Sequence, residues 1–200
     1  QTCALPISDS PVTPRTIRIG NRLVGDGHPA YVVAEIGINH NGSVDLALKL
    51  VDAAVRAGCD AVKFQKRTPE LCVPAHQRDL RRETPWGYIT YLEYRNRIEF
   101  GLDEYRAIDQ HCAERNITWF ASCWDLPSVA FIEQFGVPCH KVASALLTEG
   151  DLLDAVRATG RPVVLSTGMS TQEQIDTAVE RLGRDNLLVA HCTSTYPCDP

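Results

Sequence analysis

The sequence of 200 residues lacks several patterns that would identify its class at once. No apolar run approaches the roughly 18 residues that a membrane-spanning helix requires, and the first residues do not have the pattern of a secretory signal peptide. Basic residues form no dense stripe, and the formal net charge is -5. These absences argue against a protein that binds membranes or nucleic acid, and we expect a cytoplasmic globular protein.

The eight cysteines include no C-x-x-C pair, so the ligand spacing of structural zinc sites is missing. Several of them, such as Cys123 and Cys139, lie within apolar runs. We therefore expect free, buried thiols in a reducing cytosol rather than a disulfide-linked secreted domain.

The sequence does contain a regular alternation of strand and helix patterns. Apolar and polar residues alternate around Gly20-Asn21, which predicts a β-hairpin within 15–30. Ser43 and Thr171 are predicted helix N-caps, and the insert 66–101 interrupts the alternation. The predicted strands are 31–36, 61–65, 118–123, 140–143, 162–166 and 187–191. The predicted helices are 43–57, 102–115, 127–135, 150–159 and 171–182.

This alternation predicts a parallel sheet with helices outside it. An open doubly wound sheet and a closed (β/α)8 TIM barrel both fit. No G-x-G-x-x-G follows the first predicted strand, which weakens the case for a dinucleotide-binding sheet. The barrel is favoured because polar residues lie at the ends of all the predicted strands, where a barrel gathers its site. These residues are Glu35, Lys63, Gln65, Ser122, Lys141, Ser144, Ser166 and His191.

The predicted barrel is incomplete. A closed barrel of this kind has eight strands in about 250 residues, whereas six are predicted here. A six-stranded remnant would expose two open edges. We expect 31–200 to be a partial barrel that is poorly soluble and inactive alone. Residues 1–8, QTCALPIS, resemble a translated sequencing adapter and are left out of the fold prediction.

Lys63 and Lys141 are the first candidates for chemistry, because each interrupts an apolar strand. An unpaired buried ammonium is costly, so each lysine is expected to meet an anion. That anion could be a carboxylate in a structural ion pair. Ser122, Ser144 and Ser166 at neighbouring strand ends favour a bound phosphate or carboxylate instead. A Schiff-base lysine is a further alternative.

Two later segments, STGM at 166–169 and HCTSTYP at 191–197, place hydroxyl and backbone donors after the last two strands. Such groups can bind an anion or cap a helix. Tyr196 could contact a sugar or anchor its loop, and His191 could be a core histidine.

Five motifs carry a family resemblance: AEIGINHNG, AVKFQ, KVAS, LSTGMS and HCTSTYP. In this order and spacing they resemble the sialic acid synthase family over about residues 15–200. The resemblance implies a (β/α)8 barrel followed by a small antifreeze-like domain, in a domain-swapped homodimer. It also implies a reaction between phosphoenolpyruvate and an open-chain N-acetylated amino sugar, such as N-acetylmannosamine, with a divalent metal (Mn²⁺ or Mg²⁺).

The resemblance also assigns roles to individual residues. The residues that correspond to phosphoenolpyruvate contacts are Lys63, Lys141, Ser144, Ser166 and Ser194. Gln65 and Tyr196 correspond to contacts with the amino sugar, and Glu35 to the acid of the first strand. With Ser122 as a further substrate-binding hydroxyl, Glu35, Lys63 and Lys141 are the predicted catalytic residues.

Two positions depart from the family pattern. Many members have a glutamate two residues after the serine of the fourth-strand motif, where this chain has Leu146. Either Glu35 or Glu149 would then supply the acid, or the chain belongs to a branch of the family that is built differently. A Ser-Thr pair common at the end of the third strand is Ser122-Cys123 here.

The family's two metal-binding histidines and its sugar-capping arginine are expected beyond Pro200, and His191 is not one of those histidines. We therefore predict no metal ligand within this chain. A non-catalytic barrel that binds a phosphorylated metabolite is the alternative from another class, and Leu146 favours it.

Overall fold

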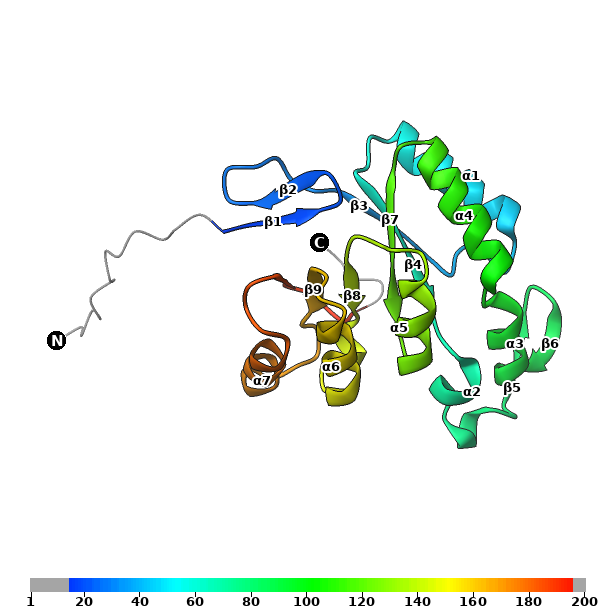
Figure 1. The fold of residues 1–200 in the computed structure, drawn as a ribbon. Helices are drawn as coiled ribbons and strands as arrows, with labels where there is room; N and C mark the ends of the chain where they lie inside the picture. Colours follow the sequence, from blue (N-terminus) through cyan, green and yellow to red (C-terminus); the bar gives the residue numbers. More distant parts are fainter. Residues whose placement is uncertain (1–14, 196–200) are drawn as a thin grey trace.

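A computed structural model describes residues 15–195 (Figure 1). Its main sheet has six strands, and each of them pairs in parallel with the next one along the chain. In sheet order they are β3 (Val33–Gly37), β4 (Ala61–Lys66), β7 (Thr118–Cys123), β8 (His140–Val142), β9 (Val163–Ser166) and β10 (Leu187–Ala190). A doubly wound sheet reverses its strand order at a switch point. No reversal occurs among the described strands, so the doubly wound alternative is wrong.

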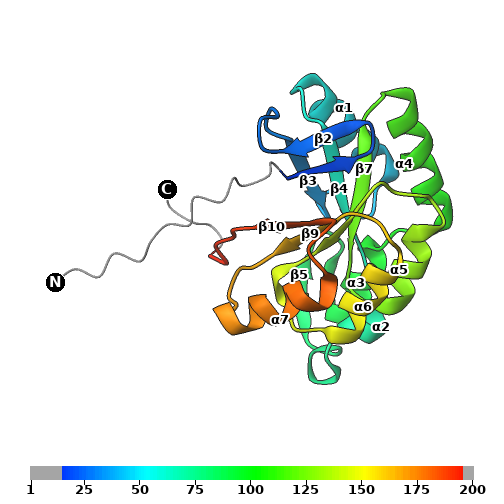
Figure 2. The same ribbon diagram turned by 60° about the vertical axis from the view of Figure 1, so that its left-hand side comes forward.

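Helices alternate with these strands and lie outside the sheet (Figures 1 and 2). The main ones are α1 (Val44–Arg56), α4 (Leu102–Glu114), α5 (Leu126–Glu133), α6 (Gly150–Ala158) and α7 (Gln172–Leu182). Both predicted N-caps are confirmed. The Ser43 hydroxyl accepts a hydrogen bond from Leu46 N at 3.3 Å, and the Thr171 hydroxyl accepts one from Gln174 N at 3.3 Å. These bonds satisfy amides that have no partner within the helix.

The core fills the space between the helices and the sheet. Val51 of α1, Ile108 of α4 and Ile132 of α5 are all fully buried. The consecutive residues Ala61 and Val62 of β4 are also fully buried, although successive strand residues face opposite sides of a sheet. Burial on both sides is typical of a parallel strand within an α/β protein.

An antiparallel hairpin of β1 (Thr16–Ile19) and β2 (Arg22–Gly25) precedes the sheet. It covers the amino-terminal ends of the sheet strands. A Cβ atom on Gly20, in the hairpin turn, would lie 3.3 Å from the hydroxyl of Thr118, the first residue of β7. Arg22 also pairs with Asp60, directly before β4, at 2.6 Å. The opposite end of the sheet is therefore the one left for a site.

The insert after β4 is structured, which sequence analysis did not predict. Its elements are α2 (Pro69–Cys72), the 3₁₀ helix η1 (Ala75–Gln77), β5 (Arg81–Thr84), β6 (Gly87–Thr90) and α3 (Tyr91–Ile98). β5 and β6 form a hairpin whose turn contains Pro85 and Trp86. In Figure 1 the insert lies at the far end of the molecule from β1 and β2. None of the helices within 15–195 is long and apolar enough to cross a membrane.

Candidate functional site

The carboxyl ends of the parallel strands bring the predicted site residues to one edge of the sheet. In the strand register, Glu35 of β3 stands opposite Lys63 of β4, and Gln65 of β4 stands opposite Ser122 of β7. Ser122 in turn stands opposite Lys141 of β8. Side chains from four consecutive strands therefore meet at this edge.

Lys63 is buried and bound on two sides. Its Nζ lies 2.7 Å from Glu35 Oε2 and donates a hydrogen bond to Ser122 Oγ at 2.8 Å. Burial lowers the pKa of Lys63, and the adjacent Glu35 carboxylate opposes that shift. The anion expected beside Lys63 is thus supplied by this chain, in a structural ion pair.

Lys141 has a different environment. Its Nζ donates to Ser166 Oγ and, at 3.2 Å, to the carbonyl of Val142. No carboxylate of the described residues lies within 4.0 Å of this ammonium group. Burial, helped by the charge of Lys63, lowers the pKa of Lys141 to about 8. The group is mostly protonated at neutral pH, and it can pair with an anion from outside the chain.

The serines of the later strands gather around Gly168, two residues after β9. The Gly168 amide donates a hydrogen bond to Ser144 Oγ at 3.0 Å. A Cβ on Gly168 would lie 3.0 Å from that oxygen and would collide with Ser194 Oγ. Only glycine allows both hydroxyls to come this close to the backbone. Ser166 also accepts a hydrogen bond from the thiol of Cys192 at 3.2 Å. Hydroxyl, amide and thiol groups therefore cluster around Ser166, the hydrogen-bond partner of Lys141.

Gln65 and Glu35 lie together on the other side of Lys63. A Cβ on Gly37, whose φ is +56°, would stand 3.0 Å from Glu35 Oε1 and 3.3 Å from Gln65 Nε2. The amide oxygen of Gln65 accepts a hydrogen bond from Arg67 Nη2. Sequence analysis missed Arg67. The only available signal was a second basic residue directly after the strand, in KFQKR.

Two histidines of the described residues, His40 and His191, have no contact with this group. His40, in the polar stretch after β3, is buried and stacks on Phe100 with ring centroids 3.9 Å apart. Burial lowers the pKa of His40 to about 4, so it is a neutral core residue. His191 is exposed, and the core position considered for it is therefore wrong. Tyr196 lies outside the described residues.

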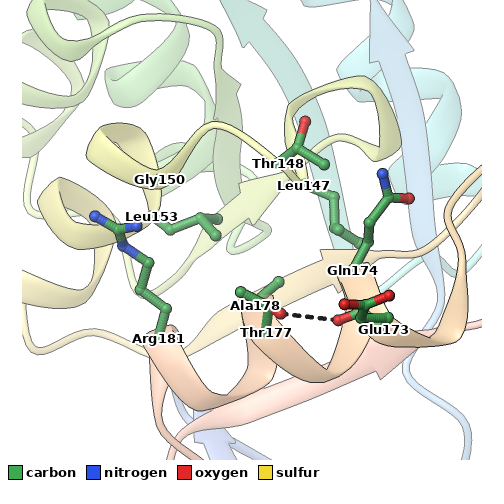
Figure 3. Close-up of a pocket in the computed structure, with 9 residues that line it drawn as sticks. All are labelled: Leu147, Thr148, Gly150, Leu153, Glu173, Gln174, Thr177, Ala178 and Arg181. Carbon is green, nitrogen blue, oxygen red and sulfur yellow. Dashed lines mark hydrogen bonds between the residues drawn. The ribbon is translucent and has the colours of Figure 1, made fainter.

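Two pockets of the described residues are lined partly by the segment after β8. One of about 520 Å³ lies at the same end of the sheet, and its lining includes Trp124, Leu146 and Glu149. The other, of about 200 Å³, lies between α6 and α7, and Figure 3 shows its lining residues, among them Leu153, Ala178 and Arg181. No predicted site residue lines the pocket between the helices, so the strand ends remain the candidate site.

The described residues do not fit a metal centre. Within 15–195, no three side chains of His, Cys, Asp or Glu are placed to hold an ion. The one carboxylate of the strand-end cluster, Glu35, already faces the ammonium of Lys63. A divalent cation would compete with that charge for the same oxygen atoms.

Several known proteins are similar to this chain. N-acetylneuraminate-9-phosphate synthase of Drosophila melanogaster is 35% identical over 175 residues, which cover 85% of this chain and 47% of the relative. The enzyme of the same name from Homo sapiens is 35% identical over 184 residues, which cover 90% of this chain and 51% of the relative. The chain thus spans about half the length of these relatives.

A solved structure is also similar to this chain. The N-acetylneuraminic acid (sialic acid) synthetase of Leptospira borgpetersenii, in complex with citrate, has a TM-score of 0.81 and 29% identity, and the match covers 93% of this chain and 62% of that one. The pattern of the NeuB family matches residues 50–200. With its parallel strands and its lysines and serines at one sheet edge, the chain belongs to the NeuB family.

Proposed function

We propose that the protein containing this chain condenses phosphoenolpyruvate with an N-acetylated amino sugar and releases phosphate, forming a nonulosonic acid. The observation that carries this proposal is the pair of lysines, the buried Lys63 and the half-buried Lys141, among serine hydroxyls at one end of a parallel sheet. The names of the similar proteins indicate the reaction class.

The fold proposal follows from the strand order. Six parallel strands in chain order, with helices outside, support a segment of a closed (β/α)8 barrel. The strands at the two ends of the sheet, β3 and β10, would then be joined through further βα units. The antiparallel hairpin would close the end of the barrel opposite the site.

Lys141 is the proposed centre of phosphoenolpyruvate binding. It has no carboxylate partner among the described residues, and it donates a hydrogen bond to Ser166. The hydroxyls of Ser144 and Ser194 approach Gly168, two residues after Ser166. An ammonium supplies charge, and hydroxyls supply directional hydrogen bonds to phosphate or carboxylate oxygens. The same groups would stabilise the negative charge that develops on the departing phosphate.

The proposed chemistry has two bond-forming steps. C3 of the enol phosphate attacks the aldehyde carbon of the open-chain sugar. Water then adds to the oxocarbenium-like C2, and phosphate leaves by cleavage of its C–O bond. Gln65 and Tyr196 would contact the sugar. Glu35 would handle protons, because it touches Lys63, whereas Glu149 is exposed and lines the neighbouring pocket with Leu146.

Other parts of the proposal concern the complete protein. A divalent metal (Mn²⁺ or Mg²⁺) would need ligands other than the residues described here, and none of the steps above is assigned to it. A homodimer, a small antifreeze-like domain and a cytoplasmic location are likewise proposed from the family resemblance.

The direct test is an assay of phosphate release by the complete protein. Phosphoenolpyruvate is supplied with N-acetylmannosamine or with a bacillosamine-derived sugar, in the presence of Mn²⁺. We expect release that depends on the sugar, and a fall of about 100-fold or more in turnover for Lys141→Ala, because a donor aimed at developing charge is lost. Lys49→Ala, an exposed lysine of α1, is the matched control.

Other results would exclude the proposal. No phosphate release with any N-acetylated hexosamine-type acceptor would rule out the synthase. A protein that binds phosphoenolpyruvate tightly without turnover would be the non-catalytic barrel, in which Lys141→Ala reduces affinity alone. Covalent trapping of pyruvate by borohydride would instead identify a Schiff-base aldolase.

A further inference from the structure

The orientation of the Gln65 amide is determined by a neighbouring cation. A glutamine amide has an accepting oxygen on one side and a donating NH₂ on the other, whereas a guanidinium has donors only. Because Arg67 Nη2 contacts the Gln65 amide, the oxygen Oε1 must face Arg67. The NH₂ group must then face the other way, toward Gly37 and Glu35.

Arg67 is held on several sides. Only 2% of the residue is exposed. Its guanidinium carbon lies 4.3 Å from the ring centroid of Trp124, in a cation–π stack. Its Nε lies 3.3 Å from Glu99 Oε1. An arginine fixed by an aromatic face and a carboxylate has little freedom to turn, so it can impose its geometry on Gln65.

Glu99 completes this arrangement from the far end of the insert. Its carboxylate accepts a hydrogen bond from the Arg67 backbone amide at 3.2 Å and lies 3.9 Å from Lys66 Nζ. Burial raises the pKa of Glu99 to about 7, against the opposing effect of Arg67 and Lys66. Arg67, which contacts Gln65, directly follows β4. The two residues that hold Arg67 are Trp124, directly after β7, and Glu99 of the insert.

We propose that Arg67 is a positioning residue, which holds Gln65 so that its NH₂ group faces the acceptor sugar. This inference rests on the proposed function, in which Gln65 contacts the sugar. It adds which kind of chemical group the sugar must place beside the Gln65 NH₂ group. The matching group is a hydrogen-bond acceptor, such as an amide carbonyl or a hydroxyl oxygen, and a group that can only donate is disfavoured.

The test measures KM values of the complete protein for both substrates. Arg67→Met removes the donor, and Arg67→Met combined with Glu99→Gln also avoids a buried unpaired carboxylate. Both variants are expected to raise the KM for the sugar about tenfold or more and to leave the KM for phosphoenolpyruvate within about twofold, because only the sugar contact is disturbed. Arg97→Met, which removes a surface arginine paired with Glu93 at 2.6 Å, should change neither value.

A double-mutant cycle separates positioning from a general loss of structure. Arg67→Met should add less than about twofold to the KM for the sugar when Gln65 is already alanine, because its effect passes through that amide. Arg67→Lys, which keeps a donor, should restore part of the affinity. Fully additive effects, or an equal rise in both KM values, would overturn the inference. A wild-type protein without phosphate release would instead refute the proposed function itself.

Discussion

Lys63 and Lys141 show how two lysines at the same end of one sheet acquire different properties. Both lie on buried strands of one sheet, and in both burial lowers the pKa. Glu35 contacts Lys63 at 2.7 Å and counteracts the effect, while Lys141 faces hydroxyls and the charge of the other lysine. Lys141 is therefore the cation whose charge varies near physiological pH.

This difference predicts a pH dependence of ligand binding. Below pH 8 the Lys141 ammonium is present and, under the proposed function, attracts phosphoenolpyruvate, whereas above its pKa of about 8 the charge is lost. Calorimetric titration should therefore show an affinity that falls as the pH rises from 7 to 9, approaching about tenfold per pH unit. Lys141→Arg, whose guanidinium stays charged throughout this range, should remove the dependence. An unchanged pH profile in this variant would assign the effect to another group.

At the scale of elements, the segment between β9 and α7 combines two functions in a few residues. Gly168 brings the hydroxyls of Ser144 and Ser194 together, and Thr171 then starts the helix. The Gln174 side chain accepts a hydrogen bond from the Thr171 amide at 2.9 Å, which completes a reciprocal capping box. The capping box therefore anchors the end of the loop that carries Gly168, against which Ser144 and Ser194 lie.

Loss of the α7 cap should be measurable as a change in stability. Thr171→Ala is expected to lower the free energy of unfolding by about 1 kcal/mol, because the Gln174 amide loses its acceptor. Thr177→Ala lies on the same helix and removes only a bond to the carbonyl of Glu173. Its effect should stay within about 0.5 kcal/mol, since alanine has the higher helix propensity. Urea unfolding of the complete protein provides the comparison, and equal losses in both variants would contradict a capping role.

At the scale of the whole molecule, different elements lie at the two ends of the sheet strands. The hairpin of β1 and β2 covers one end, and the structured insert with Arg67 and Glu99 lies at the other. The hairpin belongs to the main core, because Ile19 is 2% exposed and lies in the same hydrophobic cluster as the sheet strands. It is an integral part of the fold rather than a separate unit.

Ile19→Ala is therefore expected to lower the free energy of unfolding by about 2–5 kcal/mol, as for other large-to-small changes in a core. Leu23→Ala, on the facing strand of the hairpin and 38% exposed, is the control and should cost less than about 1 kcal/mol. Denaturant unfolding of the complete protein measures both. A loss of less than about 1 kcal/mol for Ile19→Ala would show that the hairpin is only loosely attached.

The sequence by itself determined the local parts of this protein. The period of its apolar residues located the strands of the sheet and the helices between them, and polar residues at strand ends marked the edge of the candidate site. These signals are local, because side-chain periodicity and capping depend on residues a few positions apart.

Only the tertiary structure decided how the site residues are partnered. Nothing local to Lys63 and Lys141 indicates that the first pairs with Glu35 while the second has no carboxylate partner among the described residues. Arg67 was missed for the same reason, since its role depends on Glu99 and Trp124, which lie 32 and 57 positions further along the chain. Strand register and the folding of the insert bring these groups together, and the ionisation and orientation of a buried group follow from such neighbours.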